Sequence, residues 1–271
     1  MPENVTEKNM RQIRAASKLI RRKQRQYETQ NLQFAEMRED AGLKEYLDRT
    51  TFINKDGEVC EFTDLQKHDL NLVLQKRYAL LNWQQGSGKT AAVYHRAKYL
   101  LKFRRARNVI ILAPAIATNM TWVPFLTVNK ERFRTIQNLR DLDHVPEGTF
   151  LVVSTSMLGK LKKGLMRFVR RTCGKLCLVF DESDEITNPT SQRTRNVLCI
   201  FRRIRYKILD TGTTTRNNIA ELYSQFELLY NNSVNMICWS PQVYHENRDH
   251  EIEEENNPDY GTPFPAFRGH V

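Results

Sequence analysis

The residues of greatest chemical interest form a short glycine-containing run, Trp83-Gln84-Gln85-Gly86-Ser87-Gly88-Lys89-Thr90. The run follows an apolar stretch at residues 79–81 and precedes a helix-like stretch that starts at Ala91. Backbone amides of such a loop bind anions, a lysine reaches phosphate oxygens, and a threonine hydroxyl binds Mg²⁺. The predicted nucleotide ligands are Gln85, Gly86, Ser87, Gly88, Lys89 and Thr90, and Thr90 is also a predicted metal ligand.

The start of this run departs from the general Gly-x-x-x-x-Gly-Lys-Ser/Thr pattern. Trp83 stands where that pattern has its first glycine, and we expect Trp83 to end the preceding strand. An ordinary glycine turn before a helix is the alternative interpretation. A partner motif is therefore needed to decide between the two.

A second candidate motif is the apolar run at residues 176–180, which ends in Asp181 and Glu182. A buried strand delivers such residues to the carboxyl edge of an α/β sheet, where ligands bind. Asp181 is predicted to hold Mg²⁺ there, and Glu182 to act as the general base toward the attacking water. The alternative is that the two acids begin a surface loop, and Lys89 upstream disfavours it. Lys89, Asp181 and Glu182 are thus the predicted catalytic residues.

The composition has a strong excess of basic residues. The 271 residues include 42 Lys and Arg against 31 Asp and Glu, for a net charge of +11. This length suits one large α/β domain with flanking segments, and the charge suits a polyanionic partner, either nucleic acid or a membrane surface. No apolar run is long enough to span a bilayer and the N-terminus is too charged for a secretory signal, so we expect a soluble intracellular protein.

The cysteines are predicted to be reduced and structural. Their number, 5, is odd, and they are scattered along the chain, unlike a disulfide framework. Cys173 and Cys177 have no second Cys or His pair at zinc-finger spacing, so no zinc site is expected.

From Phe62 to about residue 232, apolar runs alternate with amphipathic, basic stretches. This pattern is typical of a parallel sheet with helices on both faces, and the absence of polar alternation indicates strands buried on both sides. The strands are predicted at residues 79–81, 109–113, 135–139, 150–154, 176–180 and 207–209. The basic helical or loop stretches are predicted at residues 96–107, 160–171 and 193–207.

Two flanking segments complete the predicted domain organisation. Residues 1–55 form a basic helical extension, in which residues 8–25 are either a solvated helix or an arm that contacts nucleic acid. Residues 56–232 form the α/β lobe. Residues 233–271 form an irregular acidic and Pro-containing tail, interpreted as a loop or as the start of an absent region.

The ordered motifs resemble those of superfamily two helicase-like ATPases, in particular the Swi/Snf-type branch. Residues 181–184 resemble motif II, and residues 186–189 resemble the Lys-Asn-Pro that follows it in that branch. The remaining motifs are similar at Leu65-Gln66 before the first strand, Leu112-Ala113-Pro114 for motif Ia, residues 153–158 for motif Ib and residues 209–218 for motif III. The departures from the branch are Trp83, Asp184 where His is usual, and Thr214 where Pro is usual.

The resemblance implies a single RecA-like P-loop domain that uses ATP and Mg²⁺. By the same resemblance, Gln66 reads adenine. The resemblance also implies that Thr211, Gly212 and Thr213 couple the state of the γ-phosphate to the nucleic-acid groove. Contacts to the nucleic-acid backbone fall to Pro114, Ser154 and Thr155.

Enzymes of this kind close two RecA-like lobes around ATP, and the second lobe supplies arginine fingers. No Gln-x-x-Gly-Arg-x-x-Arg run occurs in the sequence, so we expect an active site that needs a second lobe, in the same longer protein or in another chain. The expected function is that of the ATP-binding lobe of a nucleic-acid-dependent ATP hydrolase, a helicase-like translocase on duplex DNA. A nonhydrolytic nucleotide- and nucleic-acid-binding scaffold and an RNA helicase lobe are the alternatives.

Overall fold

The computed structural model describes Met10, Arg14, Ser17 and Arg21 and residues 37–54, 56–172, 174–212 and 222–230. One compact unit extends from Arg38 to Asn231. Its strands are β1 (Thr51–Ile53), β2 (Val59–Glu61), β3 (Tyr78–Asn82), β4 (Asn108–Ala113), β5 (Phe133–Thr135), β6 (Phe150–Ser154), β7 (Leu176–Phe180) and β8 (Tyr206–Thr211). Its α-helices are α2 (Ala41–Asp48), α3 (Asp64–Gln75), α4 (Lys89–Lys102), α5 (Ala115–Ala117), α6 (Val123–Val128), α7 (Leu158–Arg171), α8 (Gln192–Phe201) and α9 (Tyr223–Tyr230).

Short turns of other helical types connect these elements. A π-helical turn, η1 (Thr118–Trp122), joins α5 to α6. Three 3₁₀ turns, η2 (Leu139–Leu142), η3 (Thr155–Met157) and η4 (Ser183–Ile186), lie next to strands or helices. A separate antiparallel hairpin pairs β1 with β2.

A six-stranded sheet forms the centre of the unit, with the strand order β3-β8-β7-β4-β6-β5. All neighbouring pairs in this sheet are parallel, so the residues that follow the strands emerge at one common edge. The predicted parallel α/β sheet is confirmed. The order also places β3, β8 and β7 side by side, although they come from distant parts of the chain.

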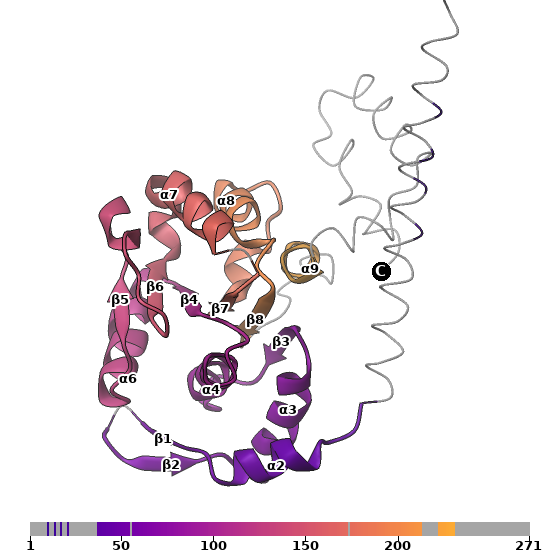
Figure 1. Ribbon diagram of the computed structural model, residues 1–271, viewed down its shortest axis with the longest axis vertical. Helices are drawn as coiled ribbons and strands as arrows, with labels where there is room; N and C mark the ends of the chain where they lie inside the picture. The colour runs from indigo at the N-terminus through magenta and orange to yellow at the C-terminus, as the bar shows by residue number, and fades with distance from the viewer. Residues whose placement is uncertain are drawn as a thin grey trace, which may run out of the picture. The chain divides into compact units, whose positions relative to one another are not determined.

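Alternation along the central strands divides the interior into two cores. Along β7, Cys177 and Val179 belong to one core, whereas Leu178 and Phe180 belong to the other. All five residues of β7 and all six of β4 are buried, because helices cover both faces. The first core lies under α2, α3, α4 and α6, and the second under α7, α8 and α9 (Figure 1).

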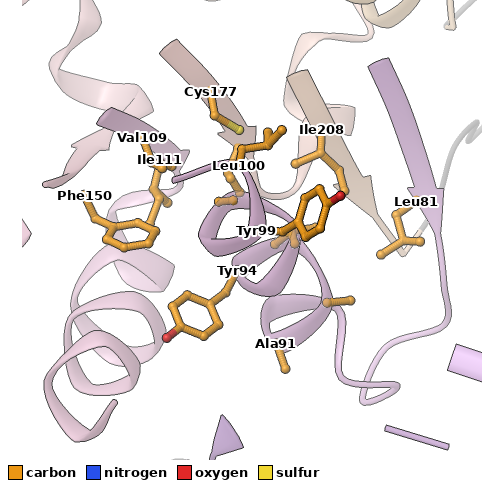
Figure 2. Close-up of a cluster of buried hydrophobic side chains, with 14 of the residues drawn as sticks. Leu81, Ala91, Tyr94, Tyr99, Leu100, Val109, Ile111, Phe150, Cys177 and Ile208 are labelled. Atoms are coloured by element: carbon orange, nitrogen blue, oxygen red, sulfur yellow. The ribbon is translucent and has the colours of Figure 1, made fainter. Parts of the chain in front are cut away.

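Helix α4 is the central helix of the first core. It buries a broad stripe that includes Tyr94 and Leu100. Val109, Cys177 and Ile208 project toward it from three different strands (Figure 2). This packing fixes the helix, and with it the residue at its N-terminus, against the middle of the sheet.

Two details differ from the sequence-based expectations. The strand predicted at residues 135–139 lies at Phe133–Thr135, because Asn138 accepts a hydrogen bond from Arg140 N at 3.0 Å and caps η2 instead. The β1–β2 hairpin was not predicted. Leu47 of α2 and Phe52 of β1 pack in the first core, although both precede the predicted boundary at residue 56.

The three-part domain division itself stays a prediction. In the basic stretch at residues 8–25, the described residues Arg14 and Arg21 are helical and exposed, and most of the stretch lies outside the described residues. The predicted tail at residues 233–271 lies outside them as well. Cys60, Cys177 and Cys199 are free thiols. Among the described helices, none combines the length and the apolar composition that a membrane span requires.

Candidate nucleotide-binding site

The glycine run forms a loop between β3 and α4, with Lys89 as the first residue of the helix. Gly86 and Gly88 have φ angles of 82° and 80°, a left-handed conformation that favours glycine. The Ser87 hydroxyl donates to Gln84 O at 2.6 Å and closes the loop on itself. The first N–H groups of a helix have no partner within it, so this loop leads into an anion-binding helix terminus.

Helix α3 holds the loop from outside. Trp83 directly follows β3 rather than ending it, and its indole Nε1 donates to Asp69 Oδ2 at 2.8 Å. Gln66 donates from Nε2 to Ser87 O at 2.8 Å. Its Oε1 accepts from Thr63 N, also at 2.8 Å, in the capping box of α3. Both ends of the Gln66 amide are therefore engaged within the chain, and its role in reading adenine stays a prediction.

The Lys89 ammonium group lies between the glycine loop and the end of β8. Its Nζ donates to Trp83 O at 3.2 Å. A Cβ added to Gly212 would lie 3.2 Å from the same Nζ, so a larger residue at this position would require Lys89 to shift by a few tenths of an ångström. The side chain that is predicted to bind phosphate thus lies next to Gly212, in the segment that is predicted to couple ATP to nucleic acid.

Asp181 lies at the end of β7 and is 7 % exposed. Its Oδ2 accepts a hydrogen bond from Trp122 Nε1 at 2.7 Å, and its backbone N–H donates to Leu112 O at 2.9 Å. Burial raises the pKa of Asp181, while the Trp122 hydrogen bond acts in the opposite direction. The predicted metal ligand is therefore fixed in position by the chain itself.

Glu182 adopts a backbone conformation that is rare for a residue with a side chain. Its φ is 52° and its ψ is 56°, in the left-handed region. Non-glycine residues in this region cluster at functional sites, where the strain fixes a direction for the side chain. The Gly212 N–H donates to its carboxylate, and burial, followed by the charge of Asp181, raises the pKa of Glu182. A raised pKa suits a group that must accept a proton.

A third carboxyl group, Asp210 on β8, joins this site. It is 0 % exposed, and burial, followed by the charge of Asp181, raises its pKa well above the usual range. Sequence reasoning quoted Asp210 within motif III but gave it no role. The signal that was missed is its position two residues after Ile208, because alternation along a strand returns it to the same side of the sheet.

The predicted nucleic-acid residues occupy the other half of the same sheet edge. Pro114 follows β4, and Ser154 ends the neighbouring β6. Ser154 is half-buried, whereas Thr155 is only 5 % exposed, so Ser154 is the more accessible of the two. We call the edge formed by β3, β8 and β7 the nucleotide half, because the predicted phosphate and metal ligands lie there. Of the predicted coupling residues, Thr211 and Gly212 lie at this half, and Thr213 lies outside the described residues.

The oxygen groups at the nucleotide half suit Mg²⁺. Thr90 lies in the first turn of α4, Asp181 directly follows β7, and Asp210 is the last but one residue of the neighbouring β8. Mg²⁺ is usually bound through one or two carboxylates together with phosphate and water oxygens. Among the described residues, no group of three or more His, Cys, Asp and Glu side chains forms a complete metal cage. The donor set therefore fits Mg²⁺ that arrives with a nucleotide.

No protein-family model matches the sequence. The chain is 28 % identical over 162 residues to the SWI/SNF-related matrix-associated actin-dependent regulator of chromatin subfamily A containing DEAD/H box 1 homolog of Drosophila melanogaster. That match covers 55 % of this chain and 19 % of the relative.

Two solved structures share the fold. The Sulfolobus solfataricus SWI2/SNF2 ATPase core in complex with dsDNA aligns with a TM-score of 0.53 and 17 % identity, over 73 % of this chain and 41 % of that one. The UvsW helicase from bacteriophage T4 aligns with a TM-score of 0.50 and 14 % identity, over 69 % of this chain and 64 % of that one. The resemblance to the Swi/Snf-type branch of superfamily two is confirmed.

At these identities the solved structures establish the fold of this chain. It is a single RecA-like domain of the kind found in helicase cores. The chain spans less than two thirds of each of the three relatives. The roles of individual site residues, and the activity of a whole Swi/Snf-type protein, are therefore proposals here.

Proposed function

We propose that the chain is the ATP-binding lobe of a nucleic-acid-dependent ATP hydrolase, a helicase-like translocase on duplex DNA. The observation that carries the proposal is the meeting of Lys89, Asp181 and Glu182 at one edge of the sheet. The order β3-β8-β7 brings their strands together. Side chains that serve only the surface have no reason to converge in this way from distant parts of the chain.

The chain's own groups divide the work at the phosphates. Lys89 would leave Trp83 O and bind the β- and γ-phosphate oxygens, while the N–H groups of the glycine loop bind the same phosphates from the backbone. Thr90 and Asp181 would hold Mg²⁺, which when bound neutralises charge on the phosphates. Trp122 keeps the Asp181 carboxyl group in one orientation for this contact.

Glu182 would orient the attacking water and accept its proton. Its position next to Asp181 and the Gly212 N–H donor hold the carboxylate at the nucleotide half of the edge. Because Gly212 donates to Glu182 and lies next to Lys89, a movement of either side chain at the γ-phosphate would act directly on the end of β8. This contact supports the coupling role proposed for Thr211, Gly212 and Thr213.

A second RecA-like lobe is part of the proposal. An arginine supplied to the γ-phosphate raises the rate of related phosphoryl transfers by about 10³ to 10⁵. The chain alone is therefore proposed to bind ATP and to turn it over slowly. Brisk ATP hydrolysis by the purified chain without any partner would contradict this.

Nucleic acid is proposed to bind along the β4–β6 half of the edge. Pro114 and Ser154 lie there, and α7, which follows η3, carries six basic residues and no acid: Lys160, Lys162, Lys163, Arg167, Arg170 and Arg171. Contacts of this kind are made to phosphates and weaken with added salt. Duplex DNA is the proposed partner in part because the Sulfolobus relative was solved with dsDNA.

A fluorescent ATP analogue tests the phosphate site. Lys89→Ala removes a charge-assisted contact worth about 1.5 to 3 kcal/mol, so its affinity should fall roughly 10- to 100-fold. Glu182→Gln keeps the binding groups and should bind ATP as tightly as the parent chain. Equal affinity in Lys89→Ala and the parent would refute the phosphate role of Lys89.

Fluorescence anisotropy with duplex DNA, single-stranded DNA and duplex RNA tests the partner. Binding to duplex DNA should be tightest, and it should weaken steeply between low and physiological salt. Tighter binding to RNA would instead favour an RNA helicase lobe. Nucleic-acid binding with no ATPase activity even after a second lobe is supplied would favour a nonhydrolytic scaffold.

A further inference from the structure

Asp210 is a buried carboxyl group whose hydrogen-bond partner is another acid. It is 0 % exposed, and among the described residues no N–H or hydroxyl group donates to its Oδ atoms. Its side chain can form a hydrogen bond with the Asp181 carboxyl group only while the two acids share a proton. Burying a carboxylate without a compensating donor or cation strongly destabilises a protein. Groups that break this rule in otherwise well-packed proteins occur mainly at functional sites.

Strand register places Asp210 between the two nucleotide motifs. On β8 it lies opposite Leu81 of β3, the strand that leads into the glycine loop. The preceding Leu209 lies opposite Phe180 of β7, so Asp181 is its neighbour on the other side. Ile208 belongs to the core beneath α4, and Asp210, two residues later, turns to the same side as the N-terminus of that helix.

The charged groups around Asp210 are two further acids and one lysine. Its carboxyl group contacts that of Asp181, and Glu182 adds a further negative charge. Lys89 attracts all three acids. The proposed function commits that single ammonium group to phosphate oxygens, so the acids need positive charge from another source once a nucleotide is bound.

We propose that Asp210 is a second carboxylate of the divalent-cation site, acting together with Asp181. The proposal rests on the proposed nucleotide site, because phosphate and water oxygens would supply the other ligands. Two adjacent carboxylates and the Thr90 hydroxyl match the oxygen-only, few-ligand binding that Mg²⁺ favours. The role would give this lobe a tighter dependence of ATP binding on Mg²⁺ than Asp181 alone provides.

The test compares the full chain with Asp210→Asn and Asp210→Leu. Affinity for a fluorescent ATP analogue is measured in excess Mg²⁺ and in EDTA, and the ratio of the two affinities reports the contribution of the cation. Ligands and their close partners in metal sites change metal affinity by about 10- to 100-fold, so the ratio should fall at least tenfold in both variants. Binding in EDTA should stay the same or improve. Asp143→Asn, which removes an exposed acid after η2, serves as the control and should keep the parent ratio.

Thermal unfolding in EDTA keeps the test decisive if a variant folds poorly. Removal of a buried acid that lies against a second acid should raise the Tm of the cation-free protein, and most clearly in Asp210→Leu. A lower Tm in EDTA for both variants would show that Asp210 has a structural role and would overturn the proposal. An unchanged Mg²⁺ ratio would overturn it as well.

A third measurement separates failure of this proposal from failure of the proposed function. If the parent chain binds no nucleotide, the proposed function fails. Mn²⁺ titration followed by electron paramagnetic resonance, without nucleotide, then still decides the role of Asp210. Weaker Mn²⁺ binding in Asp210→Asn than in the parent supports the second carboxylate, and equal binding rejects it.

Discussion

The indole Nε1 of Trp122 donates a hydrogen bond to Asp181 Oδ2 at 2.7 Å, and this bond joins the two halves of the sheet edge. Trp122 ends the π-helical turn η1, in the segment that begins after Pro114 on the proposed nucleic-acid half. Asp181 belongs to the nucleotide half. Single π-helical turns inside helices often mark functional sites. A shift of η1 would therefore move or break the hydrogen bond that orients Asp181, the proposed magnesium ligand.

Trp122→Phe should weaken this connection while keeping an aromatic ring in the core. A buried carboxylate then loses a charge-assisted hydrogen bond, so the free energy of unfolding should fall by about 1 to 3 kcal/mol. The Mg²⁺-dependent part of ATP binding should weaken too. Urea unfolding and nucleotide titration measure the two effects. In the Asp181→Asn background, Trp122→Phe should lower the free energy of unfolding by less than it does in the parent. Strictly additive losses in the double variant would show that the two side chains are not energetically coupled.

Gln66 performs two tasks that substitution can separate. In Gln66→Glu the capping box with Thr63 is retained, because glutamate also accepts from the cap N–H, but the donor to Ser87 O is replaced by a repelling oxygen. ATP affinity should fall several-fold with little change in stability. Thr63→Ala is the matched variant. It should destabilise the protein by about 1 kcal/mol and leave nucleotide affinity intact.

Gly212 offers a test of the contact between motif III and the phosphate lysine. In Gly212→Ala the new Cβ would lie 3.2 Å from Lys89 Nζ, so the ammonium group must shift by a few tenths of an ångström. We expect weaker ATP binding and a nearly unchanged free energy of unfolding. Gly159→Ala is the control, since a Cβ there meets nothing within 4 Å and should stabilise α7 by up to about 1 kcal/mol. Parent-like ATP affinity in Gly212→Ala would contradict the proposed contact.

His95 of α4 predicts a loss of stability in mild acid. It is 5 % exposed, its ring nitrogens have no hydrogen-bond partner in the part of the chain that the structure describes, and it packs against Phe52, Phe62 and Tyr94. Burial, with the charge of Lys98, lowers the pKa of His95 to about 3. Between these two pKa values, the unfolded chain, with an ordinary histidine pKa of about 6.5, therefore binds a proton that the folded chain does not bind.

Stability should consequently fall as the pH drops from about 6.5 toward 3. The loss from this one group is about 2 kcal/mol at pH 5, from the difference between the two pKa values. Denaturant unfolding at pH 7.5 and pH 5 measures it, with His95→Leu as the comparison. The variant should lose less stability than the parent over this interval. Equal losses would mean that His95 is not the acid-sensitive group.

The strands with the most uniform composition could be predicted from the sequence. β6 and β7 lie at the predicted residues 150–154 and 176–180, because unbroken apolar, β-branched runs form strands that are buried on both faces. β5 was misplaced, because Asn138 favours a cap over an extended conformation and no periodic pattern opposes it. The β1–β2 hairpin has only three residues per strand, too few for a pattern to show.

The candidate site was predictable where chemistry depends on residues next to each other in the chain. Gly86 to Thr90 and the pair Asp181-Glu182 can be recognised in the sequence by residue type and spacing. The side chains that hold these motifs in position cannot be recognised in this way. Trp122 meets Asp181, and Trp83 meets Asp69, only because strand order and helix packing bring them together. For Asp210, alternation after Ile208 indicates which side of the sheet it faces, but only the strand order shows that it lies beside Asp181.

The pairing of β3 with β8 has a consequence for biosynthesis. β3 lies at the edge of the sheet, and there Tyr78 is opposite Lys207 and Asn82 is opposite Thr211. The strand that carries the glycine loop must therefore wait, during translation, until nearly the whole lobe has left the ribosome. Such late, long-range pairing slows folding and leaves an apolar strand without its neighbour meanwhile. If the glycine loop binds ATP only after this pairing, ATP binding by a ribosome-bound chain would indicate that β8 has paired with β3.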